Sequence, residues 1–495
     1  MEPSRGNFNR AVAIAFAAAL LCLLPTASAS ARLMVFWSNL GASKISSAPL
    51  IEEGNGADLQ IAAPYVDQPY GTAIDAAAGR IYWLNRGGSG SIGYANLDGS
   101  GAGLLNTAGA GFNNPAGLAI DPVGRKIYWG NPETGHESIG YASLDDSGGG
   151  LLKPTGATLE PNGIAVDPTD NRIYWSNFEA PGAGKISYSN LDGSNAHDLD
   201  TTGAPVNGPE GVAVDSSKGR VYWANYEGDS FGYAGVNGGG GGTPNLNLAV
   251  SKPIGVAIDP LNQVLYWGSE GFERMGVGNL AGCCTTPLSI GSAAQSVPSF
   301  PAILRSPLMA RFPDVTGRHA PGSTLSCSPG TWAGDQVESF YYRAPQSFAY
   351  QWLRNKKPVS GATASTIVAS KVGAYACEVK ATNFAGSDTE TSPEFKLNAT
   401  VGLKKVTFNR KKGTATLRVA ITGAGRLDLY GTGVANVSRK KASGTAKLIA
   451  RSSGKARIKL KTTGKARVKA TISYTPEGGK AIKRRKTVVL KKKLR

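Results

Sequence analysis

The sequence predicts an all-β protein: a six-bladed β-propeller followed by an immunoglobulin-like β-sandwich and a small basic β-sandwich. Three observations support this class. Tryptophan recurs at intervals of 46, 46, 46, 48 and 44 residues, the apolar spacing of amphipathic helices is nearly absent after residue 30, and glycine makes up 65 of 495 residues. A regular repeat of this length is typical of propellers and other stacked architectures, and abundant glycine indicates many tight turns.

Five of the six repeats have the same internal order. A "GxAxD" segment, such as 71–75, comes about ten residues before an "IYWxN" segment, and "SIGYANLDG" or a looser copy follows. Short runs rich in β-branched and aromatic residues between Asp/Gly/Asn turns predict four strands per repeat, and six sheets stacked radially bury each other's faces. We expect the repeated tryptophans to pack between adjacent sheets as structural residues: Trp37, Trp83, Trp129, Trp175, Trp223 and Trp267.

The pattern resembles the YWTD repeats of the low-density lipoprotein receptor family, also called class B repeats, over residues 33–306. The resemblance implies a six-bladed propeller. The aspartate that ends the family's motif is replaced by asparagine at Asn85, Asn131, Asn177 and Asn225, and by Ser269 in the last copy. An amide keeps hydrogen bonding but not the charge, so receptor-type ligand binding is not expected.

Ring closure is also predictable. The first repeat has no "GxAxD" strand before Trp37, whereas the segment 299–306 follows the last repeat without a unit of its own. We expect these two strands to pair, because joining the ends of the ring removes unpaired strand edges. The propeller is therefore predicted to span residues 30–306.

The first 29 residues have the features of a secretory signal peptide: two arginines, a 14-residue apolar run and an A-x-A cleavage signal. No later segment is apolar for 18 residues. We expect a mature protein outside the cell, secreted or associated with the cell surface, without a transmembrane segment and monomeric.

Residues 307–400 contain Cys327, Trp352 and Cys377 in that order, with Tyr375 two residues before the second cysteine. This arrangement resembles the immunoglobulin-like modules of bacterial surface proteins. In an exported chain the resemblance implies a core disulfide between Cys327 and Cys377. The adjacent Cys283 and Cys284 leave three alternatives open: a vicinal disulfide, pairing with another chain, or free thiols.

Residues 401–495 hold 28 Lys and Arg against two acids, which gives this end of the chain a charge of +26 and the rest −8. In the segments 455–461 and 465–474 the cations alternate with apolar residues, and this period of 2 predicts strands with one cationic face. Polyanion binding is assigned to Lys455, Arg457, Lys459, Lys461, Lys465, Arg467 and Lys469. We favour anionic envelope polymers over nucleic acid as the partner, because this segment lacks the aromatic residues that stack on bases. A third interpretation is that the charge only keeps the surface soluble.

Propeller ligands commonly bind where the innermost strands begin. The residues expected at this channel mouth are Gln68, Asn114, Glu160, Glu210 and Lys252. The sequence thus favours a non-enzymatic binding or scaffold protein, with no cofactor and no metal, whose propeller recognises a protein or a glycan. The alternative is a metal-dependent hydrolase of the lactonase-like propeller class, in which oxygen ligands near Glu160 hold Ca²⁺. The aspartates that end the "GxAxD" segments are expected to cap turns rather than act as acids or bases.

Overall fold

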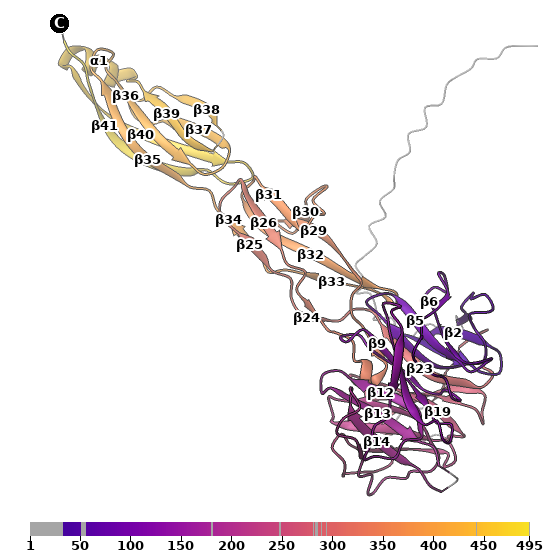
Figure 1. Ribbon diagram of the computed structural model, residues 1–495. Helices are drawn as coiled ribbons and strands as arrows, with labels where there is room; N and C mark the ends of the chain where they lie inside the picture. Colours follow the sequence, from indigo (N-terminus) through magenta and orange to yellow (C-terminus); the bar gives the residue numbers. More distant parts are fainter. Residues whose placement is uncertain are drawn as a thin grey trace, which may run out of the picture. The chain divides into compact units, whose positions relative to one another are not determined.

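The structure is a computed structural model that describes residues 33–50, 56–179, 182–246, 249–280, 282, 286–288, 290–293, 295–441 and 443–494. The predicted signal peptide and the Cys283–Cys284 pair lie outside these ranges. The described chain is built from β-strands with one α-helix and one short 3₁₀ helix (Figure 1), which confirms the all-β prediction.

Within the described residues the repeats fold into six antiparallel sheets, each one blade. Their strands are β4 (Pro69–Asp75), β5 (Arg80–Asn85), β6 (Ser91–Asn96) and β7 (Gly103–Leu104); β8 (Leu118–Asp121), β9 (Lys126–Asn131), β10 (Ser138–Ser143) and β11 (Gly149–Leu152); β12 (Pro161–Asp167), β13 (Arg172–Asn177), β14 (Lys185–Asn190) and β15 (His197–Asp198); β16 (Pro209–Asp215), β17 (Arg220–Asn225) and β18 (Ser230–Gly235); β19 (Pro253–Asp259), β20 (Val264–Ser269), β21 (Arg274–Asn279) and β22 (Thr286–Pro287). The remaining blade contains β1 (Leu33–Asn39), β2 (Lys44–Pro49), β3 (Ala57–Asp58) and β23 (Pro298–Arg305).

The ring closes as predicted. β23 pairs antiparallel with β1, with Ile303 opposite Val35 and Ala302 opposite Phe36. The innermost strands β4, β8, β12, β16, β19 and β23 contact one another in that order, and β23 also contacts β4. The last strand of the repeat region therefore completes the blade that the first strand begins.

The six repeated tryptophans are at most 2% exposed and lie in the propeller core. In four blades the residue directly opposite the tryptophan on the next strand is a glycine, as in the pair Trp83 and Gly93. A Cβ added at Gly93 would come within 2.4 Å of the Trp83 ring. The glycine thus leaves room for the indole, and all six tryptophans lie in the core of the propeller.

The next part of the chain forms β24 (Met309–Arg311) with β27 (Thr331–Trp332), a sheet of β25 (Val315–Gly317), β26 (Ser323–Cys327) and β31 (Thr366–Ala369), and a sheet of β29 (Ser347–Arg354), β30 (Lys357–Pro358), β32 (Gly373–Asn383), β33 (Gly386–Thr391) and β34 (Phe395–Leu397). Cys327 and Cys377 are joined as a disulfide with Cα atoms 6.2 Å apart, beside the buried Trp352. The Tyr375 hydroxyl donates to the Lys371 carbonyl at 2.9 Å.

The C-terminal part forms two sheets around a separate apolar core. One sheet contains β35 (Val401–Asn409), β36 (Thr414–Ile421) and β39 (Gly444–Ala450); the other contains β38 (Val437–Lys441), β37 (Gly425–Tyr430), β40 (Lys465–Pro476) and β41 (Ile482–Lys491). The segment 455–461 is not the strand that its alternating pattern predicted. It lies within helix α1 (Gly454–Thr463), which ends at Gly464 with a φ of 64°.

Candidate functional site

A Pro-x-Gly sequence lies at the start of five of the six innermost strands, while β23 begins with Pro298, Ser299 and Phe300 instead. The glycines of neighbouring strands approach so closely that a Cβ at Gly117 would lie 2.7 Å from the Gly163 Cα, and one at Gly163 would lie 2.8 Å from the Gly211 Cα. This ring of close backbone contacts brings the residues before the glycines together at one end of the propeller. They are Tyr70, Ala116, Asn162, Glu210 and Ile254, with Phe300 from β23 as the sixth.

Glu210 is the buried acid of this cluster. It is 9% exposed, and its Oε2 accepts a hydrogen bond from the Tyr70 hydroxyl at 3.2 Å, although the two residues are 140 positions apart. Burial raises the pKa of Glu210 to about 7, with Arg86 acting in the opposite direction. Burial and the nearby Glu210 charge raise the pKa of Tyr70 well above its usual value. At neutral pH the Glu210 carboxyl therefore exists both protonated and ionised, so it can donate or accept a hydrogen bond.

One cation, Arg86, and several aromatic rings lie near this acid. The Arg86 guanidinium lies 3.4 Å from the Tyr70 ring centroid and donates from Nε to the Pro115 carbonyl at 2.8 Å. Phe300 meets the Tyr70 ring edge-on with centroids 5.2 Å apart. Nearby, the Tyr226 hydroxyl donates to Glu270 Oε2 at 3.0 Å, and burial raises the pKa of Tyr226. Aromatic faces next to hydrogen-bonding groups are the usual lining of a binding site.

Of the five residues predicted at the mouth, only Glu210 belongs to this buried cluster. Gln68, Asn114 and Lys252 are exposed turn residues with φ values of 49°, 51° and 43°, and Lys252 Nζ lies 5.1 Å from the Tyr226 ring centroid. Glu160 is partly exposed, and burial followed by the charges of Glu179 and Glu137 raises its pKa. The residues that do come together lie two positions after each of the other four, between the proline and the glycine of each Pro-x-Gly sequence. The Pro-x-Gly spacing is the sequence signal that would have identified them.

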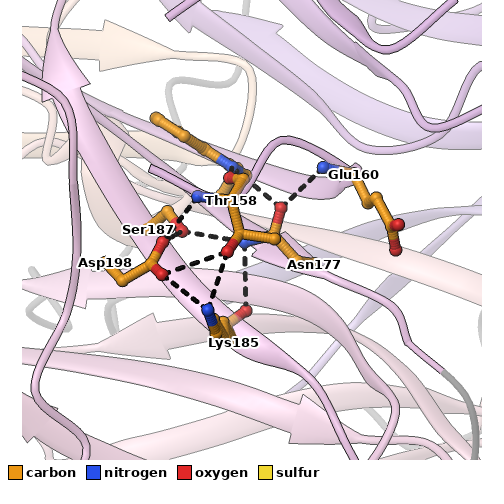
Figure 2. A network of polar contacts seen from close by, with 7 residues as sticks. Thr158, Glu160, Asn177, Lys185, Ser187 and Asp198 are labelled. Carbon is orange, nitrogen blue, oxygen red and sulfur yellow. Dashed lines mark hydrogen bonds and ion pairs between the residues drawn. The ribbon is translucent and has the colours of Figure 1, made fainter. Parts of the chain in front are cut away.

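Glu160 lies beside a polar network in the fourth repeat (Figure 2). Its backbone N–H donates to Asn177 Oδ1 at 2.7 Å, and Asn177 Nδ2 donates to Ser187 Oγ at 2.8 Å. Ser187 Oγ donates to Asp198 Oδ1 at 2.8 Å, and Lys185 Nζ pairs with Asp198 Oδ2 at 2.9 Å. Every group in the chain of contacts has a partner within the blade. The network therefore fixes the loop at 158–160 against the blade's strands.

The asparagine two residues after the tryptophan makes similar bonds in three other repeats. Asn131 Oδ1 accepts from the Asn113 N–H at 3.0 Å, and Asn131 Nδ2 donates to the Gly111 carbonyl at 3.1 Å. The Trp129 indole N–H donates to that same carbonyl at 3.2 Å. Asn85 and Asn225 make equivalent bonds. An aspartate could not donate to the carbonyl, which is a physical reason for the amide.

At the opposite end of the innermost strands the repeated aspartates cap turns, as predicted. Asp121 Oδ1, for example, accepts from the N–H groups of Val123 and Gly124, both at 2.9 Å. The second carboxylate oxygen often reaches the next blade, as in the 2.6 Å contact between Asp75 Oδ2 and Arg125 Nη1. These acids are structural.

The chain itself covers this aspartate end. A segment that follows β27 forms the 3₁₀ helix η1 (Val337–Ser339) and β28 (Tyr341–Tyr342), and β28 adds in parallel to β23. η1 contacts β8, β12, β16 and β19, and the Ser339 hydroxyl donates to the Val214 carbonyl. We call residues 335–343 the insert. Nothing in the repeat pattern pointed to it, and it leaves the Glu210 end as the candidate ligand site.

The predicted polyanion-binding residues are all exposed. Lys455, Arg457, Lys459 and Lys461 lie on α1, whereas Lys465, Arg467 and Lys469 alternate with buried residues along β40. Among the described residues of 401–494 the sole ion pair joins Arg426 and Asp428 at 2.9 Å. Most of the positive charge here has no internal partner.

Two negative findings concern the described residues alone. No group of three or more His, Cys, Asp or Glu side chains is placed there to hold a metal ion. No helix in those ranges is long and apolar enough to cross a membrane.

No protein-family model matches the chain, and no curated protein matches it. Solved structures resemble about half of this chain. A structure titled as the nidogen/laminin complex is 21% identical, covers 55% of this chain and 98% of that chain, and has a TM-score of 0.46. A gluconolactonase from Xanthomonas campestris is 19% identical over 48% of this chain and 83% of its own, with a TM-score of 0.35. TolB from Acinetobacter baumannii is 14% identical over 55% and 66%, with a TM-score of 0.39. At these identities the likeness concerns the fold alone.

Proposed function

We propose that this chain is an exported binding protein that attaches to anionic envelope polymers through residues 401–495 and recognises a ligand at the Glu210 end of its propeller. The observation that supports attachment is the unpaired charge: seven exposed cations on α1 and β40, in a region with two acids. Exposed like charges repel one another, so an external polyanion lowers the free energy of this surface.

Recognition by the propeller is supported by the residues that converge at its Glu210 end. Tyr226 offers partly exposed aromatic surface, and Glu210, which is 9% exposed, offers a carboxyl that accepts or donates a hydrogen bond. Tyr70 and Phe300 are each 4% exposed and hold Glu210 in place, since Tyr70 donates to its carboxylate and Phe300 packs on the Tyr70 ring. This set suits a ligand with both apolar surface and a hydroxyl or amide group, such as a glycan or a protein loop. The role is binding, not catalysis.

The decisive experiment for attachment uses the full chain and envelope material. Binding is expected at about 0.05 M salt and release near about 0.5 M, because a polyelectrolyte releases counterions when it is neutralised. A variant in which the seven cations are changed to glutamine should bind less and show a shallower salt dependence. Binding that does not change with salt would contradict the proposal.

Recognition by the propeller is tested after the electrostatic contribution has been screened. At about 0.5 M salt, ligand retained by the full chain should be lost in Glu210→Ala and kept in Asp98→Ala, whose side chain lies in an exposed turn on a blade edge. Equal retention by both variants would place recognition elsewhere. Circular dichroism of each variant checks that the fold is retained.

A further inference from the structure

The outer face of the sheet formed by β35, β36 and β39 has an unusual row of charges. Lys405 lies directly opposite Arg418, and Arg418 lies directly opposite Lys447, so three cations occupy one level across three neighbouring strands. All three are exposed, while Leu417 and Leu448 beside them are fully buried. Because successive side chains along a strand point to opposite faces of the sheet, the whole row points away from the core. We call these three residues the cation row.

The cation row lacks an internal counter-charge. Residues directly opposite each other in an antiparallel sheet have Cβ atoms about 5 Å apart, and like charges at that distance are destabilising. The two acids of this region are Asp428, which is in β37 of the other sheet and pairs with Arg426, and Glu477, which follows β40. Within the described chain none of the three row side chains forms a hydrogen bond or an ion pair. An external anion is the remaining source of compensation.

A second row runs parallel to the first, two residues further along each strand. Thr407 lies opposite Thr416, and Thr416 lies opposite Ile449. Thr407 and Ile449 are exposed, and Thr416 is partly exposed. The face thus presents a line of three cations next to a line of two hydroxyls and one apolar side chain.

The geometry points to a linear acidic polysaccharide. Neighbouring strands lie about 4.8 Å apart, which is similar to the length of one sugar ring in an extended glycan chain. A uronic acid polymer carries one carboxylate on each sugar ring, so a chain that crosses the strands would bring carboxylates within reach of the long side chains of the cation row. Its ring hydroxyls and apolar ring faces would meet Thr407, Thr416 and Ile449. We propose that the cation row binds such a polyuronate; this inference rests on the proposed attachment function and names its partner.

The chain offers a matched control on the other sheet. Lys469, Arg485 and Lys483 are also exposed cations on strands, but each lies opposite a hydroxyl residue, Thr487, Thr471 and Ser473 respectively. Changing all three to glutamine removes the same charge as changing Lys405, Arg418 and Lys447 to glutamine. Only the variant of Lys405, Arg418 and Lys447 removes cations that lie directly opposite one another in one row.

The experiment measures binding of the full chain to polygalacturonate and to polyphosphate at equal charge concentration. Wild type is expected to prefer polygalacturonate by about tenfold in Kd. The cation-row variant should lose that preference, and the control triple should keep it while binding both polymers somewhat more weakly. The melting temperature of the cation-row variant should equal or exceed that of wild type, because repulsion has been removed.

Two results would overturn the inference: no preference in wild type, or the same preference in the cation-row variant. Either can occur while both polymers still bind at low salt, in which case the proposed attachment function stands. Failure of the wild-type chain to bind either polymer at low salt would contradict both proposals together.

Discussion

The propeller and the C-terminal sheets use charge in opposite ways. In the propeller the repeated aspartates are at most 5% exposed, and their oxygens accept from turn N–H groups or from the next blade. In the sheets of residues 401–494 the cations are exposed and almost all lack an ion-pair partner among the described residues. Bonded, buried charge holds a structure together, whereas exposed, unpaired charge is available to another molecule.

This comparison teaches how to separate structural from functional residues in a repetitive chain. A residue that recurs in most repeats, such as Asp121 or Asn131, satisfies similar local bonds in most blades. A residue that breaks the repeat differs: Glu210 stands where other blades have Tyr70, Ala116 or Ile254. Variants in the two regions should therefore affect different measurements.

The largest effect on stability is expected from Trp129→Ala. Trp129 is fully buried, stacks on Phe112 with centroids 5.0 Å apart and donates to the Gly111 carbonyl. Its loss should lower the free energy of unfolding by about 3–5 kcal/mol, measured by urea denaturation. Phe408→Ala in the C-terminal sheets is the control, because that ring is 51% exposed. Equal losses in both variants would remove the distinction between the regions.

A smaller loss is expected from Asn131→Asp. The carboxylate cannot donate to the Gly111 carbonyl or to Ser138 Oγ, which now receive bonds of 3.1 and 3.2 Å from Asn131 Nδ2. The penalty should be about 1–3 kcal/mol at neutral pH. It should diminish in acid, because a protonated carboxyl can donate again. Asn96→Asp, at an exposed contact with Ser100, should change little. A penalty that persists unchanged at pH 4 would refute this account.

The sequence predicted the propeller well because each blade repeats its local chemistry. The Trp spacing, the "GxAxD" turns and the closing strand at 299–306 all depend on neighbours in the same or the adjacent repeat. Four of the five residues predicted at the channel mouth lie two positions before the buried cluster around Glu210, since positions such as Gln68 adopt the left-handed turn that precedes the strand. The insert was missed because its contact with Val214 joins residues 125 positions apart and recurs nowhere else.

The segment 455–461 shows where a period-2 pattern misleads. Its alternating residues fit a strand, but lysine, arginine, alanine and leucine are also strong helix formers, and Gly464 provides the left-handed residue that ends a helix. The helix leaves Ile458 64% exposed and buries Leu460. Composition and the C-terminal glycine were the signals that outweighed alternation.

Part of the pH dependence of stability should arise where the insert contacts the innermost strands of the propeller. Burial raises the pKa of Glu338 in the insert to about 7, and the charges of Asp167 and Asp215 add to the effect. The folded state therefore keeps a proton that the unfolded chain loses near pH 4.5, so this contribution is fully present below that pH and is lost as the pH rises through 7.

Glu338→Gln should therefore match wild type near pH 4.5 and be more stable by about 1–2 kcal/mol at pH 8. Urea denaturation at several pH values measures the difference. The variant should retain part of the pH dependence of the free energy of unfolding that wild type shows, because burial also raises the pKa of Glu210 to about 7. Parallel curves for the two proteins would contradict the role of Glu338.

The smallest effect on stability, and the most informative for binding, is expected from the cations of α1. Changing Lys455, Arg457, Lys459 and Lys461 to glutamate should alter the free energy of unfolding by less than about 0.5 kcal/mol, because all four are exposed. On a helix, residues four apart share a face, so Lys455 with Lys459 and Arg457 with Lys461 occupy two different sides. If attraction to polyanions is diffuse, reversing either pair should weaken binding equally, the quadruple variant should weaken it most, and the losses should shrink as salt is raised. A loss confined to one pair and insensitive to salt would instead show that one side of α1 forms a shaped site, and the comparison between bonded and unpaired charge would then fail for this part of the chain.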